Sequence, residues 1–117
     1  MSGRRGARRG MLLALAFVAA PASAADATKG KAVYDVRCTA CHGPTGGGDG
    51  PAAAAIDPRP RNFRDAEFWK SHTPEQLREV VKHGKPGTLM APFEGVLSDA
   101  EIDDVVRYLG TFRPAAQ

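Results

Sequence analysis

The chain has only two cysteines, Cys38 and Cys41, so it cannot form the network of disulfide bonds that stabilises many small exported domains. A zinc site is excluded as well, because no further cysteine exists and His72 and His83 are too far apart for the usual ligand spacing. A thioredoxin-like redox pair is disfavoured, since no strand–helix–strand pattern surrounds the cysteines. The two thiols therefore need another role.

Strand-like alternation of apolar and polar residues is missing, and so is any long apolar run. The stretch from Met11 to Ala20 is about half as long as a membrane-spanning helix must be, and Pro21 ends it. The sequence therefore predicts an all-α protein with no stable membrane insertion.

The first 24 residues have the order of a secretory signal peptide. A basic segment without acidic residues precedes the apolar stretch, which ends in the small residues Ala22-Ser23-Ala24. We predict cleavage after Ala24, with cleavage after Ala25 as the alternative. Residues 1–24 would then be a removed leader, and residues 25–117 would form one domain in the periplasm.

Outside this leader there is no excess of basic charge. The whole chain has 16 basic and 13 acidic side chains, but four of the arginines lie in residues 1–24, which leaves 12 basic residues against 13 acidic ones. The mature domain is therefore close to neutral and gives no basis for binding nucleic acid. A domain of this size has a modest core and often needs a cofactor to be firmly stable.

Three helices and one long loop account for most of residues 25–117. The first helix is predicted over residues 28–38, and a second begins at the capping box Thr73-Pro74-Glu75-Gln76 and ends at Gly84. The third begins at the capping box Ser98-Asp99-Ala100-Glu101 and ends at Gly110. Its apolar stripe consists of Ile102, Val105, Val106 and Leu109. Residues 43–64 are rich in glycine and proline and predict a loop, and residues 65–70 suit a short helical turn.

The sequence Cys38-Thr-Ala-Cys41-His42 explains the isolated cysteine pair. Two thiols three positions apart can add to the two vinyl groups of a haem, and a histidine directly after the second cysteine can then bind the iron. A bare disulfide would not call for that histidine. We therefore predict one covalently bound haem c, with Cys38 and Cys41 forming thioethers and His42 as an axial ligand.

The second axial ligand is predicted to be Met90. It is the only methionine outside the leader, and it lies in a loop bounded by Pro86 and Pro92 that could hold a thioether rigidly. The alternatives are core packing of Met90, ligation by His72 or His83, or an open position. His72 directly precedes a helix cap and suits an exposed site, and His83 in a last helical turn suits the surface.

These features together resemble the class I cytochrome c family, and in particular the small bacterial monohaem cytochromes. The resemblance rests on "GKAVYDVRCTACHG" near the start of the mature domain, on "LMAPF" before the last helix, and on the closing "LSDAEIDDVVRYL". It implies a small cytochrome c fold with three main helices and long loops wrapped around one haem, in which Gly30 and Tyr34 meet Tyr108.

The resemblance also implies contacts around the haem. A backbone carbonyl in the loop after the haem motif should accept a hydrogen bond from the ring of His42, with Pro51 and Pro58 as candidates. At least one of Arg59 and Arg61 would meet a haem propionate, unless both are solvated. Trp69 would either donate to a propionate or pack as a core aromatic.

With both axial positions filled, the expected function is one-electron transfer between redox partner proteins such as oxidases, reductases or dehydrogenases. The protein is then predicted to be a monomeric carrier and not an enzyme. A haem-based gas sensor is one alternative, and it requires Met90 to leave the iron. A cytochrome subunit of a larger respiratory or dehydrogenase complex is the other.

Overall fold

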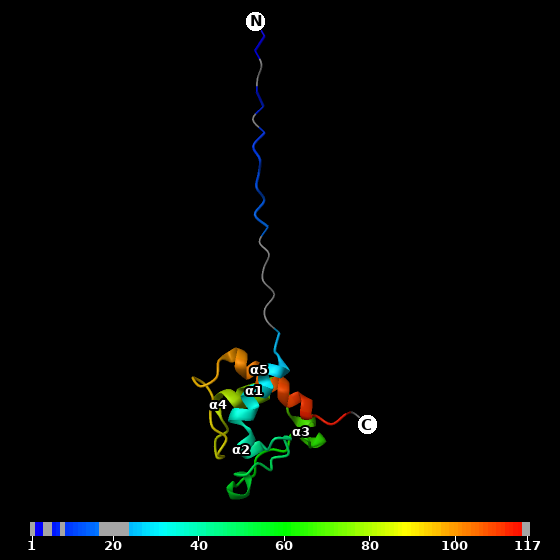
Figure 1. Cartoon of the computed structure of the whole chain (residues 1–117), viewed down its shortest axis with the longest axis vertical. Coiled ribbons are helices and arrows are strands. Elements are labelled where there is room, and N and C mark those ends of the chain that lie inside the picture. The colour runs from blue at the N-terminus through cyan, green and yellow to red at the C-terminus, as the bar shows by residue number, and fades with distance from the viewer. Residues whose placement is uncertain (1, 4–5, 8, 17–23, 116–117) are drawn as a thin grey trace.

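The computed structural model describes residues 2–3, 6–7, 9–16 and 24–115, and the architecture of this part of the chain is helical (Figure 1). Its helices are α1 (Ala27–Arg37), α2 (Thr39–His42), α3 (Ala66–Ser71), α4 (Pro74–His83) and α5 (Asp99–Leu109), with short 3₁₀ turns at Ala53–Ala55 and Gly110–Phe112. These described ranges contain no strand, only an isolated bridge between Glu94 and Leu97. The predicted all-α fold is confirmed.

The two predicted capping boxes form as expected. The Thr73 hydroxyl accepts from the Gln76 N–H while the Gln76 side chain accepts from the Thr73 N–H, and Ser98 and Glu101 do the same at the start of α5. Each box satisfies backbone donors that a helix start leaves unpaired, at a stabilisation of about 1 kcal/mol. These caps fix where α4 and α5 begin.

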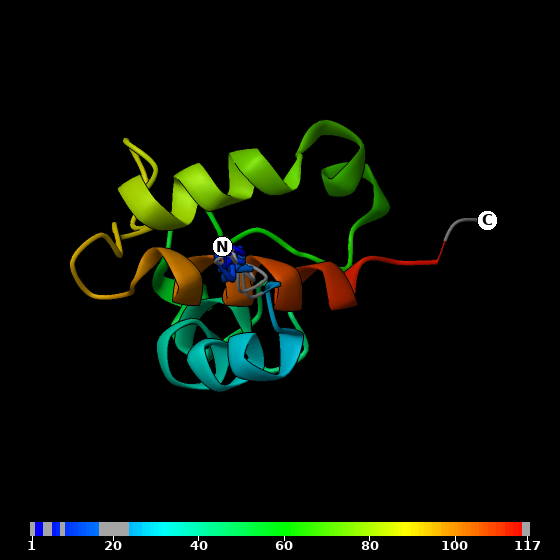
Figure 2. The same ribbon diagram turned by 90° about the horizontal axis from the view of Figure 1, so that it is seen from above.

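Helix α5 lies between α4 on one side and α1 on the other (Figure 2). All four residues of its predicted apolar stripe are buried: Ile102, Val105, Val106 and Leu109. Leu77 and Val81 of α4 belong to the same core. Outside this core, Lys82 pairs with Asp99 at 3.1 Å, which links α4 to the first turn of α5. Helices α1 and α4 therefore pack on two sides of α5.

The crossing of α1 and α5 depends on Gly30. A Cβ atom at this position would lie 1.9 Å from the carbonyl oxygen of Asp104 and 2.9 Å from the Cβ of Tyr108. Only glycine allows such a close approach. Next to the crossing, the rings of Tyr34 and Tyr108 meet edge to face with centroids 5.2 Å apart. The predicted contact of Gly30 and Tyr34 with Tyr108 is confirmed.

The predicted leader falls partly outside the described residues. Residues 9–16 contain no helix or strand, and the side chains of Met11, Leu12 and Leu15 are exposed. Residues 17–23, which include most of the predicted cleavage motif, lie outside the described residues. The signal peptide and its cleavage after Ala24 therefore stay predictions. Within the described ranges, no helix combines the length and apolar character needed to cross a bilayer.

Candidate haem site

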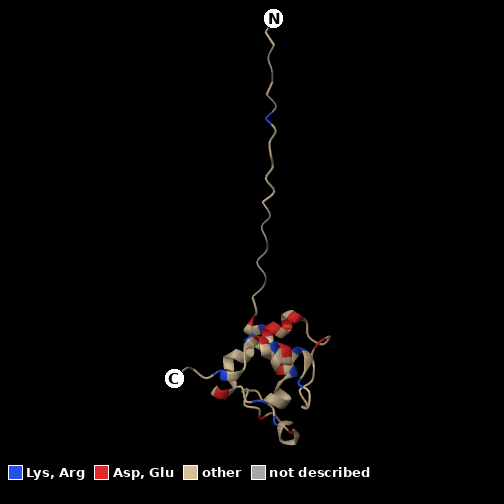
Figure 3. Cartoon of the chain, turned by 180° about the vertical axis from the view of Figure 1, so that it is seen from behind, with Lys and Arg blue, Asp and Glu red and all other residues tan. Residues whose placement is uncertain are grey.

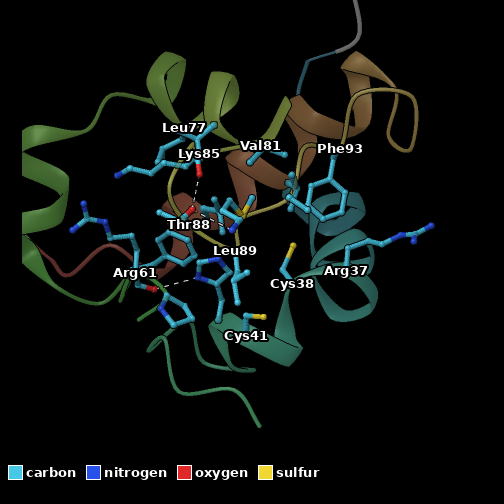
Figure 4. A pocket seen from close by; sticks show the side chains of 18 of the residues that line it. Arg37, Cys38, Cys41, Arg61, Leu77, Val81, Lys85, Thr88, Leu89 and Phe93 are labelled. Atoms are coloured by element: carbon cyan, nitrogen blue, oxygen red, sulfur yellow. Dashed lines mark hydrogen bonds between the residues drawn. The ribbon is translucent and has the colours of Figure 1, made fainter. Parts of the chain in front are cut away.

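A cavity of about 430 Å³ lies between α2, α4, α5 and the loops, with predominantly apolar walls (Figure 4). A volume of this size is within the range of cofactor sites. Cys38, Cys41, His42 and Met90 all line it. The structure therefore brings together the four residues that the sequence singled out, although Met90 is far from the other three in the chain.

The two cysteines are positioned by a break between two helices. Helix α1 ends at Arg37, Cys38 is both its C-cap and the residue before α2, and Cys41 follows one helical turn later. Both thiols are free and half-buried, and both residues line the cavity (Figure 4). Burial, with a smaller contribution from Cys41, raises the pKa of the Cys38 thiol to about 11. Cys38 is therefore a neutral thiol at pH 7.

The imidazole of His42 is held by a backbone carbonyl and an aromatic ring. Its Nδ1 lies 3.2 Å from the carbonyl oxygen of Arg61, and its ring stacks on Phe63 with centroids 4.6 Å apart. Because a carbonyl can only accept, Nδ1 carries the hydrogen and Nε2 keeps its lone pair for a metal. Burial lowers the pKa of His42, although the bond to Arg61 opposes this shift. The neutral form that binds metals is therefore favoured.

The carbonyl partner of His42 corrects one expectation. The candidates were Pro51 and Pro58, but the structure uses Arg61. The loop carries Arg61 to this position because Phe63 N–H donates to Gly46 O at 2.7 Å.

Met90 is held by the loop between α4 and α5. Gly84, with φ of +74°, turns the chain out of α4, and Lys85 N–H then donates to the carbonyl of Met90 at 3.2 Å. The N–H of Met90 donates to the hydroxyl of Thr88 at 3.2 Å. On the far side of the loop, Phe93 N–H donates to Val81 O at 3.0 Å. The bond between Lys85 and Met90 thus closes the loop on itself, the bond between Phe93 and Val81 ties it to α4, and the half-buried Met90 lines the cavity.

The other two histidines have different surroundings. His72 is half-buried rather than exposed as predicted, because its Nδ1 bonds to the carbonyl of Phe68 at 2.8 Å and its ring stacks on that phenyl group. His83 is on the surface as predicted, with Glu79 and Glu94 each 3.4 Å from one of its ring nitrogens. Of these two, only His72 lines the cavity.

Trp69 is a buried residue whose indole N–H bonds to the backbone. Its indole N–H donates to the carbonyl of Phe63 at 2.7 Å, and the ring is buried against Phe68. The prediction that this indole donates to a haem propionate is therefore wrong, and the alternative prediction, that Trp69 packs as a core aromatic, is confirmed. Arg59 and Arg61 are both exposed, and the Arg61 side chain points away from the cavity in Figure 4.

Three contributions to the site were not predicted from sequence: the Arg61 carbonyl, the stacking of Phe63 on His42, and the hydroxyl of Tyr34. The last donates to the carbonyl of Gly43 at 2.5 Å and so ties α1 to the residue after His42. Burial is the main cause that raises the pKa of this phenol. The sequence offered one signal for the role of Phe63, namely that it is an aromatic residue at the end of a glycine-rich loop.

The donor set fits a covalently attached haem. Two thiols one helical turn apart, an imidazole with Nε2 free, and a thioether all border one apolar cavity. The described residues contain no cluster of three or more histidine, cysteine or acidic side chains that would suit a bare metal ion. This combination of helices, cavity and donors is that of a c-type cytochrome domain.

The chain belongs to the family described as cytochrome c oxidase, cbb3-type, subunit III, whose model matches residues 25–109. Members of the cytochrome c family bind haem c covalently and take part in electron transfer.

Individual relatives agree with this membership. The chain is 30% identical over 92 residues to cytochrome c-554(547) of Halothiobacillus neapolitanus, covering 77% of this chain and 100% of that protein. It is 38% identical over 98 residues to dihydro-heme d1 dehydrogenase of Pseudomonas aeruginosa, covering 83% of this chain but only 18% of that protein. A reducing HAO-like protein complex of Kuenenia stuttgartiensis contains a similar fold, with a TM-score of 0.66, 29% identity, and coverage of 75% of this chain and 43% of that one.

Proposed function

We propose that residues 25–117 form a periplasmic carrier of single electrons with one haem c, held covalently by Cys38 and Cys41 and ligated axially by His42 and Met90. The observation that carries this proposal is that all four side chains line one cavity although Met90 comes from a separate segment. Haem c, when bound, supplies one-electron exchange between Fe(III) and Fe(II).

The residues of the chain would tune and protect that exchange. The Arg61 carbonyl holds the His42 ring in one tautomer and makes Nε2 a better donor. The apolar walls exclude water, and a thioether ligand raises the reduction potential. Because His42 and Met90 would occupy both axial positions, no position stays open for a substrate, which supports a carrier and not an enzyme.

The location and partners are part of the same proposal. The basic and apolar order of residues 1–24 supports export, cleavage after Ala24 and a periplasmic domain. We propose that this domain works as a monomer. Its partners would be redox proteins such as oxidases, reductases or dehydrogenases. The near-neutral charge of the mature domain supports neither nucleic acid nor the membrane as a partner.

A second candidate is a cytochrome subunit that serves one fixed partner. It is favoured by the similarity to part of the Kuenenia complex and to a small part of the much longer Pseudomonas dehydrogenase. Purification of the native protein without detergent distinguishes the two: a single 25–117 chain supports the free carrier, and constant co-purification with a second protein supports the subunit.

Covalent attachment of haem to Cys38 and Cys41 is tested by producing the full chain in a bacterium with a haem c maturation system. We expect the exported protein to begin at Ala25, to gain the mass of one haem, and to keep its colour after denaturation in acid. The variant with both Cys38→Ala and Cys41→Ala should lose the covalent haem, whereas the surface variant Thr45→Ala should keep it. Two haems per chain, or none, would contradict the proposal.

A further inference from the structure

Every charged side chain that lines the haem cavity is basic. These residues are Arg37, Arg59, Arg61 and Lys85, and no aspartate or glutamate is among the lining residues. All four are exposed and come from three segments: the end of α1, the loop after the haem motif, and the Met90 loop. We call these four residues the basic rim.

Three of the four rim charges can be seen to point outward (Figure 4). In Figure 4, Arg37 lies on the side opposite to Arg61 and Lys85, and the charged ends of all three point away from the cavity. Among the residues that the structure describes, no carboxylate lies within 4.0 Å of a rim cation, whereas Arg78 and Lys82 do form ion pairs, with Asp99 and Asp103. The rim is therefore available to a charge from outside the chain.

This rim stands out against a slightly acidic domain. Residues 25–117 carry 12 basic and 13 acidic side chains, so the four rim cations are balanced by acids elsewhere. Four of those acids, Asp99, Glu101, Asp103 and Asp104, lie on α5, where Figure 3 shows acidic residues gathered. Because Asp99 and Asp103 are paired with Lys82 and Arg78, the positive charge of the rim, and not a separate acidic face, is what would orient an approaching partner when the net charge is near zero.

One exposed apolar side chain lies among the rim cations. Leu89 lines the cavity and keeps 69% of its surface exposed. An apolar centre within a charged border is the usual layout of a protein interface, and complementary charge there sets the rate and specificity of association. A lipid surface would need a longer apolar face, such as that of an amphipathic helix.

We propose that the basic rim and Leu89 form the docking surface for an acidic face of a partner protein, oriented so that electrons pass at the cavity opening. This inference rests on the proposed carrier function. It adds the site of contact and the charge of the partner, neither of which follows from the net charge.

The first test uses small oxidants of opposite charge with the reduced holoprotein. The rate with ferricyanide should fall as salt is raised, and the rate with tris(phenanthroline)cobalt(III) should rise, because exposed charges are screened over about 10 Å at 0.1 M salt. In the double variant Arg37→Gln and Arg59→Gln, the rate of oxidation by ferricyanide at low salt should fall by about twofold or more. The control Arg107→Gln makes the same kind of charge change on an exposed residue outside the cavity, and it should have a much smaller effect.

The second test measures binding directly. A hexaglutamate peptide added to ¹⁵N-labelled holoprotein at low salt should shift amide signals around Arg37, residues 59–61, Lys85 and Leu89, and these shifts should disappear in salt. Shifts spread over other surfaces, or equal effects of the rim and control variants, would overturn the proposal. So would binding to phosphatidylglycerol vesicles without binding to the peptide, or concentration-dependent self-association through the rim.

Failure of the rim and failure of the carrier function give different results. The absorption spectrum and midpoint potential of the wild-type holoprotein are recorded first, and a missing haem spectrum would refute the carrier. An intact spectrum and potential, combined with oxidation rates that do not respond to salt, would refute only the rim.

Discussion

The carbonyl oxygen of Arg61 lies 3.2 Å from Nδ1 of His42, across a loop that separates the two residues by 19 positions. This contact decides which ring nitrogen of His42 carries a hydrogen and leaves Nε2 facing the site of the metal. The glycine- and proline-rich loop therefore helps to orient His42, because its path places the carbonyl that accepts the hydrogen of Nδ1.

Gly30→Ala should disrupt the crossing of α1 and α5. The added methyl group would lie 1.9 Å from the carbonyl oxygen of Asp104, so one helix would have to move. We expect the free energy of unfolding to fall by about 3 kcal/mol or more, well beyond the gain of about 1 kcal/mol in helix propensity. Chemical denaturation of the holoprotein measures this. Gly110→Ala is the control, since a Cβ there meets nothing within 4 Å, and a similar loss in that variant would contradict the explanation.

Tyr34→Phe should loosen the link between α1 and the haem motif. It removes the hydroxyl that donates to the buried Gly43 carbonyl, which then keeps only the Gly46 N–H at 3.2 Å. The expected cost is about 1–3 kcal/mol of unfolding free energy. Tyr108→Phe removes the same group where the described residues show no hydrogen bond to it, and should cost less than about 0.5 kcal/mol. Equal losses in the two variants would show that the Gly43 bond is not the cause.

The positions of the helices are predictable from sequence because their signals are local. The boxes at Thr73 and Ser98 each need only four consecutive residues, and each helix begins at the second residue of its box. The partner of His42 is not predictable in this way. It depends on the path of the loop, which is fixed by bonds such as Gly48 N–H to His42 O at 2.8 Å and Phe63 N–H to Gly46 O at 2.7 Å. The sequence pattern therefore identifies four residues that line the cavity, but not the carbonyl that orients one of them.

Acid should weaken the attachment of the start of α5 to α4. Lys82 lowers the pKa of Asp99 below its usual 3.8, and hydrogen bonds from Ser98 lower the pKa of Glu101 below its usual 4.5. Because the unfolded chain binds these protons more readily, the stabilisation is present above those usual values and is lost as the pH falls through the lowered ones. The thermal midpoint of the holoprotein should therefore drop between pH 5 and pH 3.

Asp99→Asn should make that acid-induced drop smaller, because the variant has already lost the ion pair with Lys82. The control is Asp57→Asn, since no ion pair involves Asp57 among the described residues. The dependence of its thermal midpoint on pH should follow that of the wild type. An Asp99→Asn profile that also matches the wild type would refute this account of acid sensitivity.

The axial pair of His42 and Met90 is the central claim, and a redox titration of the Met90→Ala holoprotein followed by absorption tests it most directly. The account predicts that the near-infrared band of methionine-bound ferric haem is present in the wild type and lost in the variant. The midpoint potential should fall on the order of 0.1 V or more, and carbon monoxide should bind readily only to the reduced variant. The neighbouring variant Leu89→Ala should keep the band and the potential. An unchanged potential in Met90→Ala, or ready binding of carbon monoxide by the reduced wild type, would contradict the ligation and favour a gas-binding protein.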